Sequence, residues 1–167
     1  MSYNYKDYIE SAYDFPKLGI EYRDIQPILE NEQTFFDIIY DLSRLVDLEN
    51  VDYFVGIESR GFIFASALAA QNLKGFKMIR KEGKLPNTNH LLNSVSYDLE
   101  YGSATIEMKP GSGNVVIVDD VYATGGTMEA AEKLCKKSGY NVVDKICLVD
   151  IGIKKEHDIK TLIQYVD

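Results

Sequence analysis

The stretch that decides the fold runs from Val115 to Thr127 and reads Val-Val-Ile-Val-Asp-Asp-Val-Tyr-Ala-Thr-Gly-Gly-Thr. Its first four residues are apolar and β-branched, which is typical of a strand buried on both faces of a parallel sheet. Asp119 and Asp120 follow where this strand should end, and a loop of small and hydroxyl-bearing residues then leads into a helical pattern. Because ligands of open α/β sheets bind beyond the carboxyl ends of the strands, we expect a binding site here.

The loop after the two acids has the chemistry of a phosphate site. A loop that enters a helix N-terminus offers free N–H groups and a favourable dipole to an anion. Paired acids do not suit a phosphate alone, but they do suit the hydroxyl groups of a sugar phosphate. The loop matches neither the Walker A pattern nor the glycine-rich dinucleotide pattern. An ordinary helix start, with glycine permitting the turn and threonine capping it, is the alternative that these residues leave open.

Strand and helix patterns alternate along the rest of the chain. This alternation indicates an α/β fold with a central, mostly parallel β-sheet, right-handed crossovers and flanking helices. A β-hairpin is expected where residues 95–99 turn at Gly102 into residues 104–108. Apolar spacing predicts helices over residues 5–13, 31–46, 62–72 and 128–138, and strands over residues 51–57, 75–80, 142–149 and 161–166.

Composition and charge limit the class of protein. The chain has 167 residues, of which 46% are hydrophobic and 26% charged, as expected for one globular domain. Its net charge of −8 argues against nucleic acid or an anionic membrane surface as the main partner. The first residues resemble no targeting peptide, and no apolar run approaches the ~18 residues of a membrane span. We therefore expect a cytoplasmic protein without membrane partners.

The two cysteines, Cys135 and Cys147, fall on a predicted helix and a predicted strand. They form no CxxC pair, and no histidine lies near them in the sequence. We therefore expect buried free thiols, and not a disulfide or a metal site.

Val115–Met128 resembles the phosphoribosyl pyrophosphate (PRPP) binding motif of class I phosphoribosyltransferases. The resemblance spreads over nearly the whole chain, and specifically toward the adenine phosphoribosyltransferases. It implies a type I phosphoribosyltransferase fold in a single domain, residues 1–167, with a base-binding hood formed by an N-terminal segment (residues 1–30) and a flexible catalytic flap (residues 81–109). The other segments that carry it, in the order of the family, are Phe15–Ile20, Tyr22–Ile25, Val55–Phe62, Arg80–Pro86 and Ser96–Gly102.

The family reaction implied by this resemblance joins adenine to PRPP and gives AMP and pyrophosphate, a step of purine salvage. Its transition state is oxocarbenium-like, so the site must stabilise a sugar cation and a departing pyrophosphate. Mg²⁺ is the implied cofactor and would bridge the diphosphate, with Asp119 and Asp120 as candidate protein ligands and no dense ligand cluster. A homodimer is also implied, because cations at the base of the flap can come from the neighbouring subunit in this family.

The resemblance also implies roles for individual residues. Asp119 and Asp120 would hold the ribose hydroxyls and favour the positive ring. The 5′-phosphate would lie against Ala123, Thr124, Gly125, Gly126 and Thr127. Pyrophosphate oxygens would meet Arg60, Lys81 and Lys84. Adenine would be framed by Ile20, Glu21, Tyr22 and Arg23, mostly through backbone groups.

The tip of the flap carries the residues expected to act in the chemical step. By resemblance, Glu100 is the acid, base or proton-positioning group for the imidazole ring of adenine, and Tyr101 helps to close the site. Arg60 and Lys84 are expected to contribute to catalysis from the pyrophosphate side. A solvated hairpin carboxylate is the alternative interpretation of Glu100.

Two other functions remain open at this point. A phosphoribosyltransferase for hypoxanthine, guanine or xanthine should lack the segment from Phe15-Pro16 to Tyr22-Arg23-Asp24 and the segment Leu99–Gly102, and both are present. A non-catalytic regulator that senses PRPP or a purine would be expected to lose residues of the flap or to gain a basic surface. The chain keeps Glu100 and Lys84, and its net charge is −8.

Overall fold

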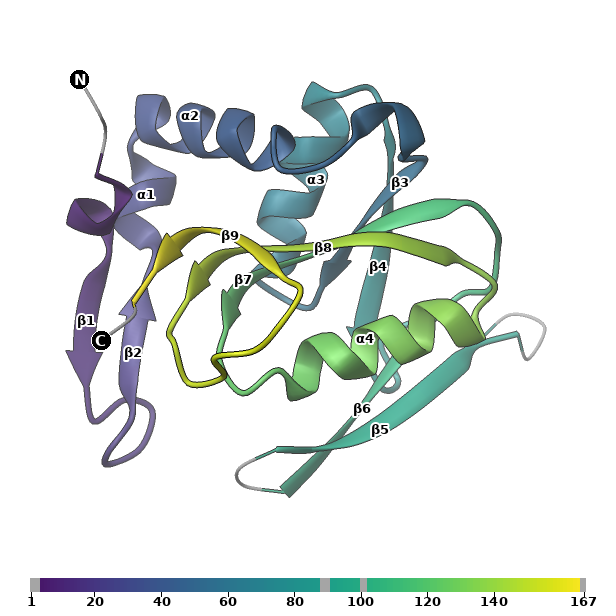
Figure 1. Cartoon of the computed structure of the whole chain (residues 1–167). Helices are drawn as coiled ribbons and strands as arrows, with labels where there is room; N and C mark the ends of the chain where they lie inside the picture. Colours follow the sequence, from purple (N-terminus) through teal and green to yellow (C-terminus); the bar gives the residue numbers. More distant parts are fainter. Residues whose placement is uncertain (1–3, 88–90, 100–101, 166–167) are drawn as a thin grey trace.

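A twisted sheet runs through the molecule and carries helices on both faces (Figure 1). The computed structural model describes residues 4–87, 91–99 and 102–165. Five neighbouring strands of the sheet are parallel, and an antiparallel hairpin extends it at one edge, which confirms the predicted α/β class. Across the described residues the strand order is β5 (Asn93–Leu99), β6 (Gly102–Met108), β4 (Gly75–Lys81), β3 (Tyr53–Ile57), β7 (Asn114–Tyr122), β8 (Asn141–Asp150) and β9 (Lys160–Gln164).

Strand β7 is buried on both faces, as its apolar run predicts. Val116 and Val118 pack into one core cluster, whereas Val115 and Ile117 pack into another on the opposite face. The first cluster is closed by the helices α2 (Glu32–Ser43) and α3 (Gly61–Gln71), and the second by α4 (Gly126–Lys137). Two cores therefore fix the end of β7 from both sides, which is where the two acids lie.

Local sequence signals explain where the helices begin. The side chain of Asn31 caps α2 by accepting a hydrogen bond of 2.9 Å from the N–H of Thr34. Helix α4 has an acid, Glu129, in its first turn and two lysines in its last turn, which suits the helix dipole. None of the helices in the described part of the chain is long and apolar enough to cross a membrane.

The helix predicted over residues 5–13 is wrong. The chain instead forms a 3-10 turn, η1 (Tyr5–Tyr8), followed by β1 (Glu10–Tyr13), which pairs antiparallel with β2 (Glu21–Asp24). The helical spacing of tyrosines is overridden by this pairing with residues 8 to 14 positions away, and Tyr13 is exposed. The small sheet leads into the short helix α1 (Gln26–Glu30), and a second 3-10 turn, η2 (Leu48–Asn50), precedes β3.

The hairpin of β5 and β6 lies against α4 (Figure 1), where the side chain of Lys137 donates a hydrogen bond to the carbonyl oxygen of Ser94. Strand β6 also pairs antiparallel with β4, so the hairpin is continuous with the main sheet. Glu100 and Tyr101 lie outside the described residues, and their roles stay predictions. The mobility and the catalytic function expected of residues 81–109 stay predictions as well.

Both cysteines are buried free thiols, which confirms the prediction made from their spacing. Cys135 lies on α4 and Cys147 on β8, on the same side of the sheet. Burial raises the pKa of the Cys135 thiol to about 12 and that of Cys147 well above its usual range. Thiols of this kind act as small apolar core residues.

We expect Gly139 to be required at the end of α4. It adopts a φ of +95°, and an added Cβ would lie 2.3 Å from the carbonyl oxygen of Gly111. Gly83 has a φ of +77° with nothing within 4 Å of an added Cβ, so Gly83→Ala is a matched control. Both substitutions should cost about 1–2 kcal/mol of unfolding free energy, because each forces alanine into the left-handed region. Gly139→Ala should cost roughly a further 1–3 kcal/mol from the clash, measured by denaturant unfolding; equal costs would contradict this packing.

Candidate active site

A cleft of about 560 Å³ opens beyond the carboxyl ends of β7 and β8. Its size is that of a small-molecule site. Four separate segments form its walls: the turn and strand before Asp24, the end of β5, the loop after β7 and the segment after β8. Its lining residues are Gly19, Ile20, Glu21, Arg23, Asp98, Leu99, Ala123, Thr124, Gly126, Thr127, Ile151 and Ile153. The structure thus brings three of the four predicted base-site residues and most of the predicted phosphate loop to one cleft.

Asp119 and Asp120 lie at the end of β7, where two core clusters hold the strand. The N–H of Asp120 donates a hydrogen bond of 2.9 Å to Oδ1 of Asp119. Burial raises the pKa of Asp119 well above its usual range, and the neighbouring charge of Asp120 raises it further. Gly61 begins α3 against this strand end, since an added Cβ would lie 2.8 Å from the carbonyl oxygen of Val118. The acid pair is therefore crowded and partly desolvated.

Arg60 supplies a positive charge to this pair from the turn between β3 and α3. Its Nε lies 2.7 Å from Oδ2 of Asp120, whose side chain is 8% exposed. Its Nη1 donates a hydrogen bond of 2.7 Å to the hydroxyl of Tyr22, and its guanidinium lies over the ring of Tyr22. Arg60 therefore links the base segment to the acid pair. Its predicted contact with pyrophosphate would require an exchange of these partners.

The loop from Ala123 to Thr127 turns the chain from β7 into α4. Gly125 has a φ of +93°, and a Cβ there would lie 2.7 Å from the hydroxyl of Tyr122, so this position needs glycine. The loop and Asp119 line one small cavity of about 70 Å³. The predicted phosphate loop and a predicted ribose acid therefore lie beside each other at a helix N-terminus, as the PRPP interpretation requires.

Of the other two cations expected at the pyrophosphate side, Lys81 ends β4 and Lys84 lies in the turn after it. The carboxylate of Glu58 accepts a hydrogen bond of 2.8 Å from the N–H of Lys81 and another from Nε of Arg80. Burial opposes the ionised form of Glu58, but these two donors hold its pKa below the usual value. The N–H of Lys84 donates to the carbonyl oxygen of Lys81. Glu58 thus holds the turn after β4 against the turn that carries Arg60.

The four predicted base-site residues divide between two environments. Ile20, Glu21 and Arg23 line the cleft, whereas the Tyr22 hydroxyl accepts the hydrogen bond from Arg60. Oε1 of Glu21 lies 2.7 Å from Nη1 of Arg23, so the charge of Glu21 is paired within the segment. An acidic residue at this position is therefore compatible with a base contact made by the backbone.

Sequence reasoning missed five cleft residues, of which Gly19 belongs to the quoted segment Phe15–Ile20. Ile151 and Ile153 follow the end of β8, and the rule that sites lie beyond the carboxyl ends of strands could have indicated them. Asp98 and Leu99 come from β5 and belong to the quoted segment Ser96–Gly102, but only the folded hairpin shows that they reach the cleft.

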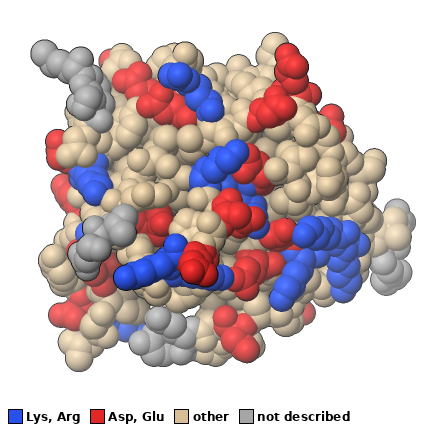
Figure 2. Space-filling model, in the orientation of Figure 1, with Lys and Arg blue, Asp and Glu red and all other residues tan. Residues whose placement is uncertain are grey.

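Charged side chains outside the cleft pair with one another across the face that Figure 2 shows, where acidic and basic residues are interspersed. Glu132 accepts contacts from both Lys136 and Lys145 at 2.6 Å. Among the described residues, no group of three or more His, Cys, Asp or Glu side chains is arranged to hold a metal ion. The carboxylate oxygens of Asp119 and Asp120 suit Mg²⁺ in kind, and a substrate would have to supply the remaining ligands.

Known proteins resemble this chain over nearly its full length. Residues 24–166 match the phosphoribosyl transferase domain family. A curated adenine phosphoribosyltransferase from Bdellovibrio bacteriovorus is 48% identical and covers 96% of this chain and 98% of the relative. Another, from Hydrogenovibrio crunogenus, is 47% identical and covers 96% of this chain and 95% of the relative.

Solved structures agree with the sequence relatives. The adenine phosphoribosyltransferase from Thermoanaerobacter pseudethanolicus has a TM-score of 0.87 at 36% identity, covering 95% of this chain and 96% of that one. The enzyme from Giardia lamblia, solved with 9-deazaadenine, has a TM-score of 0.87 at 30% identity, covering 96% of this chain and 95% of that one. The chain belongs to the adenine phosphoribosyltransferases, a branch of the phosphoribosyl transferase domain family.

Proposed function

We propose that the cleft transfers the phosphoribosyl group of PRPP to adenine, giving AMP and pyrophosphate. The observation that carries the proposal is the joint lining of one cleft by the base segment and the phosphate loop, with the acid pair beside the loop. Relatives solved with 9-deazaadenine and with adenine, from Giardia lamblia and Saccharomyces cerevisiae, support the choice of base.

The roles of the residues follow from the charges that the reaction creates. The bond from the sugar carbon C1′ to pyrophosphate breaks, a bond from C1′ to an imidazole nitrogen of adenine forms, and that ring loses a proton. As the bond to pyrophosphate breaks, the sugar becomes positive. The carboxylates of Asp119 and Asp120, crowded and partly desolvated, would then gain a cation beside them, which favours this state over the bound substrate.

Arg60 would change partners during the reaction. In the described arrangement it neutralises Asp120 and binds the Tyr22 hydroxyl. When the ribose hydroxyls take its place at Asp120, the guanidinium becomes able to meet the pyrophosphate oxygens, together with Lys81 and Lys84. Asp119 and Asp120 would hold Mg²⁺ together with the diphosphate, and the metal would supply positive charge to the leaving group.

Glu100 would take or position the proton of the adenine imidazole, and Tyr101 would help to close the site. These two roles rest on the resemblance of Ser96–Gly102 to the family flap and on the place of its neighbours Asp98 and Leu99 in the cleft wall. We further propose a homodimer that acts in the cytoplasm. Light scattering on the purified chain at micromolar concentration tests the dimer, since a monomer mass would reject it.

A base-selectivity assay tests the proposed function directly. With PRPP and Mg²⁺, adenine should give AMP and pyrophosphate, whereas hypoxanthine, guanine and xanthine should give at least about 100-fold lower kcat/KM. Chromatography of the nucleotide products measures all four. Comparable product from a 6-oxopurine would favour the other purine phosphoribosyltransferases, and PRPP binding without any nucleotide formed would favour a regulator.

Changing the two acids one at a time should separate stability from binding. Asp119→Asn replaces a carboxyl group whose ionised form the folded protein disfavours, so unfolding free energy at pH 7 should rise by about 1 kcal/mol. Asp120→Asn removes the partner of Arg60 and should lower it by about 1 kcal/mol or more. Both variants, and the double variant most, should raise the KM for PRPP or lower turnover. Unchanged kinetics in the double variant would remove the acids from the sugar site.

The pH dependence of the unfolding free energy is a control for the stability gain expected of Asp119→Asn. Because its pKa in the folded state is raised, Asp119 keeps its proton to higher pH in the folded than in the unfolded chain. Asp119 therefore lowers the free energy of unfolding of the native protein increasingly as pH rises above its unfolded pKa of about 4. The advantage of Asp119→Asn should vanish below about pH 3, where both states are protonated. An advantage that persists unchanged at that pH would contradict the raised pKa.

Glu100→Ala should lower kcat by about 10²–10⁴-fold, the usual loss when a general acid or base is removed. The KM for PRPP should change little, because the phosphate loop and acid pair are intact. Glu82→Ala removes an exposed acid of the same segment and is the matched control, expected to keep its activity. Steady-state kinetics measures both, and near-normal turnover of Glu100→Ala would exclude Glu100 from the chemical step.

A further inference from the structure

The segment between β8 and β9, residues 151–159, forms one wall of the cleft. Ile151 and Ile153 come from this segment and face the same cleft as Ile20 from the base segment. Residues 151–159 contain neither a helix nor a strand, and beyond the backbone hydrogen bond from Ile151 to Tyr122 no strand ladder holds them in place. Something else must fix the position of this wall.

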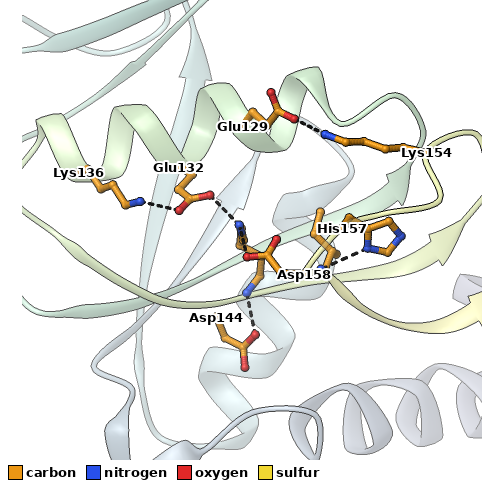
Figure 3. Close-up of polar contacts among 9 residues, drawn as sticks. Glu129, Glu132, Lys136, Asp144, Lys154, His157 and Asp158 are labelled. Atoms are coloured by element: carbon orange, nitrogen blue, oxygen red, sulfur yellow. Dashed lines mark hydrogen bonds and ion pairs between the residues drawn. The ribbon is translucent and has the colours of Figure 1, made fainter.

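Three side-chain pairs connect this segment to α4 and β8, and Figure 3 shows the one between Lys154 and Glu129. Lys154 pairs with Glu129, and Asp158 pairs with Lys145 at 2.8 Å, but Glu129 and Asp158 are 55% and 77% exposed. Exposed pairs of this kind are worth about 0–1 kcal/mol each. His157 and Asp150 are 12% and 7% exposed, and Nε2 of His157 lies 2.9 Å from Oδ2 of Asp150. The buried pair is therefore the one that can hold the wall.

Asp150 makes hydrogen bonds near both ends of residues 151–159. Its Oδ1 accepts a hydrogen bond of 2.8 Å from the N–H of Gly152, and its Oδ2 faces His157. The N–H of Ile159 donates to Nδ1 of His157 at 3.3 Å, so Nδ1 must present a lone pair. Nε2 then carries the hydrogen that is donated to Asp150. Every hydrogen-bonding group of the pair is used, and the direction of each bond is set.

The ring of His157 also packs on Tyr122, with ring centroids 4.6 Å apart. The carbonyl oxygen of Tyr122 accepts a hydrogen bond of 3.1 Å from the N–H of Ile151. The hydroxyl of Tyr122 lies beneath the phosphate loop at Gly125. The imidazole therefore has two separable functions: its nitrogens fix the isoleucine wall, and its apolar ring edge supports Tyr122.

We propose that His157 is a positioning residue that acts through Asp150 to hold Ile151 and Ile153 at the base end of the cleft. The proposal rests on the proposed function and names adenine as the group that this wall meets. Apolar side chains suit the flat, largely apolar face of a purine, and the phosphate loop supplies the polar contacts elsewhere. Loosening the wall should therefore weaken adenine binding more than PRPP binding.

His157→Leu is the decisive variant, because it removes both hydrogen bonds but keeps an apolar side chain against Tyr122. We expect the KM for adenine to rise about tenfold, as for the loss of a buried hydrogen bond to a charged group, and the KM for PRPP to change less than about threefold. His157→Gln supplies an amide N–H to Asp150 and should restore most of the adenine KM. Lys154→Met breaks an exposed pair in the same segment and should leave both KM values within about twofold of the native protein.

Asp150→Asn provides a second route if His157→Leu does not fold. The amide keeps an acceptor for Gly152 but turns a donor toward Nε2 of His157, so the adenine KM should rise here too. Amide hydrogen exchange over residues 151–159 should speed up in both variants and return toward the native rate in His157→Gln.

The outcomes distinguish this proposal from the proposed function. If the native protein makes no AMP, the proposed function fails, whereas the exchange rates still test the role of His157 in the segment. If the native protein makes AMP and folded His157→Leu keeps its adenine KM, the positioning role fails. Equal rises in both KM values, or no recovery in His157→Gln, would also overturn it.

Discussion

The site depends on placing two carboxylates at the end of a strand that is buried on both faces. Two cores hold β7 so firmly that Asp119 and Asp120 have little room to move away from each other or into water. Burial raises the pKa of Asp119, and the neighbouring charge of Asp120 raises it further. Arg60 offsets part of this effect, because its guanidinium pairs with Asp120 and is held by the Tyr22 hydroxyl. A positive charge on the sugar ring would offset the electrostatic cost of the two carboxylates, so this cost would favour the transition state over the free site.

The same constraint explains why the base segment and the acid pair are physically connected. Arg60 can bind Asp120 because α3 begins directly against β7, which in turn requires Gly61. Its second partner, the Tyr22 hydroxyl, lies on β2. If Arg60 moved from Asp120 to a phosphate oxygen, its hydrogen bond to Tyr22 in the N-terminal segment would therefore change as well. The adenine and PRPP ends of the cleft share a residue even though their lining segments are far apart in the sequence.

Much of this could be predicted from the sequence, because β7 and its loop are specified by neighbouring residues. The apolar run predicts a buried strand, and the two acids and the glycine-rich turn that follow it predict a site at the start of a helix. The helix predicted over residues 5–13 was wrong because β1 is stabilised by pairing with β2, which no local period records. Partners such as Arg60 and Tyr22, or His157 and Asp150, depend on the folded positions of different segments, and a single sequence carries no signal for them.

The two ends of the cleft are therefore specified in different ways. The phosphate end comes from one continuous stretch, and its chemistry is mostly backbone N–H groups at a helix start, which tolerate few alternatives. The base end is assembled from β2, β5 and the segment after β8, and polar pairs lie behind the walls from β2 and from the segment after β8. Isoleucine side chains alone do not specify a purine, because apolar contacts have no direction. The buried hydrogen bonds at Asp150 do have direction, so under the proposed function residues that do not touch adenine would set the shape that it meets.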